Sequence, residues 1–148
     1  MQISLARAFK ERARLNQKIL ETLNHIKEEN SIIEGGVRSF DIRKKYQELH
    51  ALTDKLITLK QAISRANAGI DDKLAELAEV KNLLARIKEI PTGEGKQVRE
   101  YSSDAVVYTA EIKKGEITEE METLRQRINS LQDEIDEFNA RTRIEFEL

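Results

Sequence analysis

The sequence predicts a mainly α protein, an antiparallel bundle of long helices with coiled-coil-like heptad packing and two short strand-like segments near the C-terminal helix. Apolar residues recur every three or four positions over long stretches, which is the spacing of one face of a helix. The 148-residue chain contains one proline and six glycines, so little interrupts such helices. Charged residues make up 35% of the chain, against about 25% in average domains, as expected for solvated helix surfaces. We therefore expect a single helical domain over residues 1–148.

The first two helices are expected at residues 2–29 and 40–68. The second is the central helix and carries a heptad seam, because apolar residues recur every seven positions with others at the intervening steps. These are Ile42, Leu49, Leu56 and Ile63, with Tyr46, Leu52, Leu59 and Ala66 between them. Gly35 and Gly36 separate the two helices, and Ser39 is the expected N-cap of the second.

The last two helices are expected at residues 72–90 and 117–140. Asn67 and Gly69 tolerate the left-handed conformation that ends many helices, so the second helix should end beside them. Pro91 ends the third helix, and Thr118 is the expected N-cap of the fourth. The short connection between helices two and three makes them antiparallel neighbours.

Two segments have the character of strands. Residues 105–112 contain Val-Val-Tyr-Thr, and residues 142–148 alternate polar and apolar side chains. The glycine-containing stretch at residues 92–96 is expected to be a loop. We expect the two strand-like segments to pair with each other, either with partial overlap within one chain or by exchange between two subunits.

Charge and composition argue against several classes of partner. The chain has 25 basic and 27 acidic residues and a net charge of -2, so we expect no nucleic-acid partner. There are no cysteines, and the N-terminus lacks the apolar core of a secretory signal. No apolar run approaches the roughly 18 residues needed to cross a bilayer, so a membrane partner is not expected. We expect a cytoplasmic protein.

No catalytic, cofactor-binding or metal-binding residues emerge from the sequence. His25 and His50 are the only histidines, and neither has an acid or base at helical spacing that stands out from a surface already rich in charge. The stretch from Gly93 to Gln97 has one residue between its glycines and no Ser or Thr after the lysine, so it departs from a phosphate-binding loop. An enzyme is therefore the least favoured function.

The best interpretation from the sequence is a helical scaffold or interaction protein that self-associates. The third helix is shorter than the others, and a second copy would cover the length that it leaves open. An unknown protein partner is also possible. The residues expected at seams within or between chains are Leu49, Leu56, Ile63, Leu124, Ile128, Leu131 and Ile135.

Three stretches resemble a known family. They are Ile63-Ser-Arg-Ala-Asn-Ala68, Arg99-Glu-Tyr-Ser-Ser-Asp-Ala-Val-Val-Tyr108 and Leu131-Gln-Asp-Glu-Ile-Asp-Glu-Phe-Asn139, which are similar to the septicolysin-like family of small bacterial helical proteins. The resemblance covers nearly the whole chain and carries over no catalytic residues. The family name implies a cytolysin, so a membrane-active, pore-forming protein is the alternative function.

Overall fold

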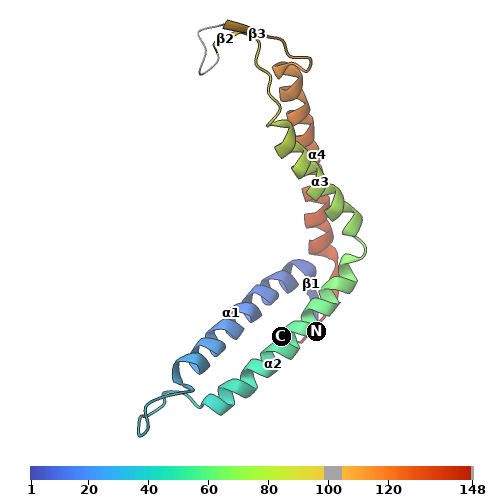
Figure 1. The fold of residues 1–148 in the computed structure, drawn as a ribbon. Coiled ribbons are helices and arrows are strands. Elements are labelled where there is room, and N and C mark those ends of the chain that lie inside the picture. The colour runs from blue at the N-terminus through green and yellow to red at the C-terminus, as the bar shows by residue number, and fades with distance from the viewer. Residues whose placement is uncertain (99–104, 148) are drawn as a thin grey trace. The chain divides into compact units, whose positions relative to one another are not determined.

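The computed structural model describes residues 1–98 and 105–147, and this part of the chain forms four α-helices and four short strands (Figure 1). Their order is β1 Gln2–Ser4, α1 Leu5–Glu29, α2 Ile42–Asn67, α3 Asp71–Ile87, β2 Gly95–Val98, β3 Ala105–Tyr108, α4 Lys114–Arg141 and β4 Arg143–Glu145. The prediction of a mainly α protein with antiparallel helices and short strand segments is confirmed.

The chain divides into two compact units, whereas the sequence suggested one domain. The first unit contains Met1–Ile70 and Asp136–Leu148, and the second contains Asp71–Ile135. Each unit is built from helices that run antiparallel to each other and from one antiparallel pair of strands. The two units are therefore described separately.

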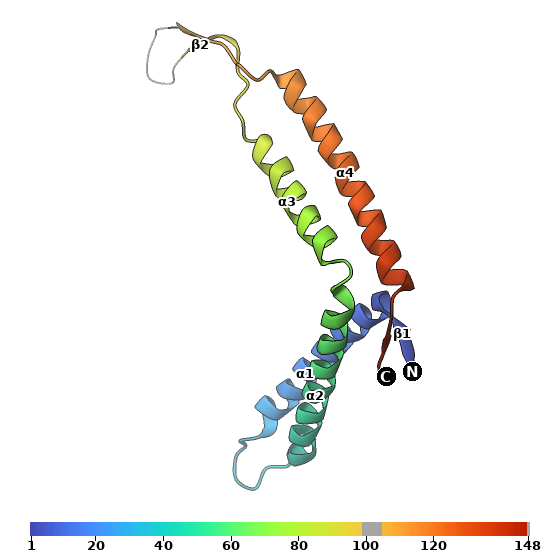
Figure 2. The ribbon, with the colours of Figure 1, turned by 90° about the vertical axis from the view of Figure 1, so that its right-hand side faces the viewer.

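The core of the first unit lies between α1, α2 and the β1–β4 sheet. Helices α1 and α2 lie side by side and antiparallel in both ribbon views (Figures 1 and 2). In the sheet, Ile3 is opposite Ile144, and the Phe146 N–H donates to the Met1 carbonyl at 3.0 Å. The buried cluster consists of Ile3, Leu5, Ala8, Leu15, Leu52, Leu59, Ala62, Ile63, Ile144 and Phe146. Each fully buried leucine in it contributes about 1.5–3 kcal/mol of transfer free energy.

The predicted pairing of residues 142–148 with residues 105–112 is wrong. Strand β4 pairs with β1 and strand β3 pairs with β2. The reason is the length of α4, whose 28 residues separate the two predicted partners by about 42 Å. Each strand instead pairs with a segment that is predicted to be helix or loop.

Two of these segments correct the predicted boundaries. Residues 2–4 are strand rather than helix, and α1 begins at Leu5 because the Ser4 hydroxyl accepts the Arg7 N–H at 3.2 Å and caps it. Residues 95–98 are strand, so the expected loop at residues 92–96 ends early. The N-cap of α2 is Asp41 rather than Ser39, since its Oδ1 accepts the Lys44 N–H at 3.1 Å.

The ends of the other helices also differ from the prediction. Ala68 has right-handed dihedral angles, and Gly69 is not among the glycines with positive φ, so α2 does not end in a left-handed turn. Gly69 permits a close approach instead, because a Cβ there would lie 3.2 Å from the Phe138 ring. Helix α3 ends at Ile87 rather than residue 90, and α4 begins at Lys114, three residues before the predicted start.

In the second unit, α3 and α4 run antiparallel (Figure 2). The Arg127 guanidinium donates to Glu76 Oε1 at 2.7 and 3.2 Å, and Lys73 Nζ lies 3.1 Å from Glu134 Oε2, so two ion pairs connect the helices. Their buried side chains are Leu77 and Val80 on α3 and Leu124, Leu131 and Ile135 on α4. At the β2–β3 sheet, the Glu94 carboxylate pairs with Lys113 and also accepts the Ala110 N–H.

Candidate functional site

The predicted seam residues lie in both units and differ in burial. Four are buried within the single chain: Ile63, Leu124, Leu131 and Ile135. Three are half-buried: Leu49, Leu56 and Ile128. The first group is accounted for by packing inside each unit, whereas the second group leaves apolar surface in contact with solvent.

Helices α1 and α2 also carry a second row of residues outside their buried stripes. On α2 the row is Tyr46, His50, Thr53 and Ile57, and on α1 it is Phe9, Ala13, Leu20 and Leu23. The spacings of three, four and seven residues place the members of each row on one helix face. Leu20, Tyr46 and Ile57 are 60%, 52% and 48% exposed, respectively. These eight residues are called the open face below.

The two rows lie on the same side of the helix pair. At 100° per residue, the α1 row is rotated by roughly 115° and the α2 row by roughly 150°, in the same sense, from the buried stripe of its helix. Because the helices are antiparallel, rotation in the same sense brings both rows to one side. The opposite side carries the ion pair between Lys18 and Glu48 at 3.6 Å and the Phe146 ring, whose centroid lies 5.7 Å from Lys55 Nζ.

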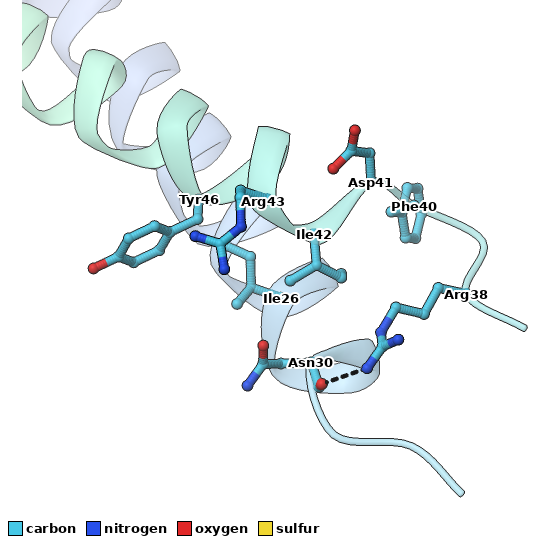
Figure 3. Close-up of a pocket in the computed structure, with 8 residues that line it drawn as sticks. All are labelled: Ile26, Asn30, Arg38, Phe40, Asp41, Ile42, Arg43 and Tyr46. Carbon is cyan, nitrogen blue, oxygen red and sulfur yellow. Dashed lines mark hydrogen bonds between the residues drawn. The ribbon is translucent and has the colours of Figure 1, made fainter. Parts of the chain in front are cut away.

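A groove of about 580 Å³ continues the open face at the loop end of the helix pair. Its lining comes from the last turn of α1, the connecting loop and the first turns of α2 (Figure 3). The lining residues are Ile26, Asn30, Arg38, Phe40, Asp41, Ile42, Arg43 and Tyr46. Figure 3 shows Arg43 and Tyr46 side by side next to Ile26, so a cation and an aromatic ring flank an apolar floor.

The loop wall of the groove is fixed by hydrogen bonds to the end of α1. Arg38 donates from Nε to the Glu29 carbonyl and from Nη2 to the Asn30 carbonyl, both at 2.9 Å, and so satisfies carbonyls that a helix end leaves open. Glu29 Oε2 accepts the N–H groups of Ser39 and Phe40 at 2.7 and 3.1 Å. Burial raises the pKa of Glu29, but hydrogen bonds with the Ser39 side chain and these N–H groups outweigh it, and the pKa lies below its ordinary value.

Each histidine is packed against an aromatic ring. His25 stacks on Phe40 with ring centroids 4.1 Å apart, and its Nδ1 is buried without a hydrogen-bond partner among the described residues. His50 contacts Tyr46 edge-on at 4.7 Å and belongs to the open face. Within residues 1–98 and 105–147 there is no group of three or more His, Asp or Glu side chains arranged to hold a metal ion.

In the same described ranges, no helix combines the length and the apolar character needed to cross a bilayer.

Four cations border the open face. Lys27, Arg43 and Lys60 are exposed, and the Arg12 guanidinium lies 5.3 Å from the Phe9 ring centroid. In the described part of the chain, none of these four is within ion-pair distance of a carboxylate. The open face is therefore an apolar strip with unpaired positive charge at its edges.

Comparison with known proteins identifies a fold but no family. No family model matches the chain, and no curated protein matches it. A solved structure from Corynebacterium diphtheriae, described as a functionally unknown conserved protein, aligns with a TM-score of 0.64 and 18% sequence identity. The alignment covers 98% of this chain and 100% of that one. This similarity shows the fold alone. The resemblance to the septicolysin-like family stays a prediction.

Proposed function

We propose that this protein is a non-enzymatic helical scaffold that self-associates through its α3–α4 helix pair. The observation that supports the proposal is the incomplete cover of the α4 seam. Leu124, Leu131 and Ile135 are buried, but Met121 and Ile128, seven residues apart on the same helix face, are half-buried. Helix α3 has 17 residues and α4 has 28, so α3 is too short to cover the whole seam.

Helix α3 contributes to the same side of the pair. Leu74 is 37% exposed, and Ala78 and Ala85 follow it at helical spacing with exposed side chains. By the rotation argument used for α1 and α2, these residues lie on the side of Met121 and Ile128. Two antiparallel helices cannot enclose a core by themselves, whereas four helices can. A second copy of the α3–α4 pair would supply the two missing helices and remove these apolar side chains from water. Leu74, Ala78, Ala85, Met121 and Ile128 are called the α3–α4 strip below.

Molar mass in solution tests the proposal directly. Light scattering over a concentration series from about 1 µM to about 1 mM should give a dimer or a larger species of the 17.0 kDa chain. Met121→Lys places a charge on the half-buried strip and should shift the mass toward the monomer. Thr123→Lys adds the same charge at an exposed position on the same helix and should leave the mass unchanged.

Two results would overturn the proposal. One is a wild-type monomer at every concentration. The other is an equal decrease of the molar mass in solution for Met121→Lys and Thr123→Lys, because the decrease would then come from the added charge and not from its position on the strip. Helix content by circular dichroism checks that Met121→Lys still folds.

A further inference from the structure

We propose that the open face of α1 and α2 binds an acidic amphipathic helix of a partner protein. This surface belongs to the first unit and is different from the α3–α4 strip, so the inference does not depend on self-association. Its support is the coincidence of an apolar strip, a groove that extends it and four unpaired cations along its border.

The apolar part matches one face of a helix. Leu20 on α1 and Tyr46 and Ile57 on α2 expose about half or more of their surface. Leu23 of the open face is half-buried, and the half-buried Leu49 lies between the α2 row and the core. A strip between two antiparallel helices offers a third helix the positions that a bundle would normally fill. Helices recognised in such grooves insert residues spaced at three, four and seven positions.

The groove extends the strip at the loop end. Ile26 forms apolar floor there, and Tyr46 belongs to both the groove and the open face (Figure 3). The hydrogen bonds of Arg38 to the end of α1 hold the loop wall in place before any partner arrives. A preformed wall lowers the ordering cost of binding.

The charge pattern selects an acidic partner. Arg12, Lys27, Arg43 and Lys60 border the open face without an ion-pair partner in the described chain. On the other side of the helix pair, Lys18 and Lys45 both pair with Glu48, at 3.6 and 3.4 Å. Asp54, an exposed carboxylate in the same stretch of α2, and Asp41, which lines the groove, offset two of the four charges. A helix with glutamates beside its apolar stripe would neutralise the remainder, and complementary charge favours both encounter and specificity.

The same charges argue against a second copy as the occupant. Two open faces packed against each other would bring the two cation borders together, and like charges across an interface oppose association.

The test uses the full chain and a fluorescent probe peptide of about 20 residues, long enough to span roughly 30 Å as a helix. The peptide has leucines at heptad positions a and d and glutamates beside them. A matched peptide has lysine in place of every glutamate. Fluorescence anisotropy should show micromolar binding of the acidic peptide and at least tenfold weaker binding of the basic one.

Two charge reversals separate the open face from general electrostatics. Arg43→Glu should weaken the acidic peptide at least tenfold. Lys44→Glu changes the neighbouring residue, in the same first turn of α2, but on the side away from the open face, and should change the affinity less than twofold. In NMR spectra of an isotope-labelled sample, adding the acidic peptide should change the chemical shifts of backbone amides in residues 9–27 and 43–60 and leave those of β4 unchanged.

Three outcomes would overturn the proposal. The first is equal affinity for the two peptides, or none for either. The second is an equal effect of Arg43→Glu and Lys44→Glu. The third is tighter binding of a labelled single-stranded oligonucleotide that is lost in Arg43→Glu, which would assign the cations to a nucleic acid.

Discussion

Truncation of Leu59 tests the core of the first unit most directly. Leu59 is completely buried in the middle of α2, within the cluster shared by α1, α2 and the β1–β4 sheet. Leu59→Ala removes three buried carbons and leaves a cavity, and such changes cost about 2–5 kcal/mol. We expect about 3 kcal/mol, because the surrounding residues come from two helices and a sheet and have little freedom to close the space.

Ile57→Ala is the matched control. Ile57 lies two residues away on the same helix and is 48% exposed, so its truncation removes a side chain that is partly in water already. Alanine also has the higher helix propensity by a few tenths of a kcal/mol, which offsets part of the loss. The expected change is below about 1 kcal/mol.

Urea unfolding followed by circular dichroism at 222 nm measures both changes. With a slope of about 1.5 kcal/mol per molar urea, a loss of 3 kcal/mol moves the midpoint of the affected transition by about 2 M. Since the chain has two compact units, Leu131→Ala in the second unit identifies which transition belongs to which unit. Equal midpoint shifts for Leu59→Ala and Ile57→Ala would refute the assignment of the core.

Three further predictions concern stability. Leu131→Asp should cost several kcal/mol, because it places an unpaired carboxylate at a position only 4% exposed, and an unchanged melting temperature would show that the α4 seam is assigned wrongly. Glu11→Gln should destabilise at neutral pH: a hydrogen bond from Arg14 lowers the pKa of Glu11, so its contribution is present above the ordinary value of 4.5 and is lost as the pH falls through the lowered pKa. The difference between wild type and Glu11→Gln should therefore shrink in acid, and a constant difference from pH 7 to pH 2 would contradict this origin. Gly35→Ala should cost about 1–2 kcal/mol in urea unfolding, because φ at this position is +84°. No neighbour would clash with the new Cβ, so the cost comes from the backbone conformation alone, and an unchanged midpoint would mean that the loop relaxes.

The helices were predictable because their signals are local. The seven-residue spacing from Ile42 to Ile63 predicts α2 nearly to its ends. The spacing of three, four and seven residues among the apolar side chains, including Leu124, Leu131 and Ile135, predicts α4. These signals depend only on residues one or two turns apart. Pairing of strands depends on which ends of the chain meet in space, and no local pattern contains that information.

The N-terminal strand shows the limit most clearly. Gln2–Ser4 has no strand partner within 100 residues of sequence, and its partner Arg143–Glu145 follows the last helix. The apolar residues Ile3 and Leu5 fit the start of a helix as well as a strand of three residues. Only the return of the C-terminus beside the N-terminus decides between the two.

The open face was missed for a different reason. The spacing of Tyr46 predicts a place in the heptad seam, but Tyr46 is 52% exposed and belongs to the second row with His50 and Ile57. A spacing of three and four residues is satisfied by two adjacent rows of one helix. The signal that distinguishes them is the match with α1, where Phe9, Leu20 and Leu23 form a corresponding row, and it becomes visible only when the helices are placed antiparallel.

The two proposed surfaces make opposite demands on the same pair of variants. Met121→Lys should lower the molar mass and leave the affinity for the acidic peptide unchanged, because residue 121 belongs to the α3–α4 strip. Arg43→Glu should do the reverse, since it removes a cation from the open face and touches no residue of that strip. If either variant changed both the molar mass and the peptide affinity, the two surfaces would not act independently. If each changes only its own, a self-associated scaffold would display one helix-binding face per copy, and the apparent affinity for a multivalent acidic partner would rise with the number of copies.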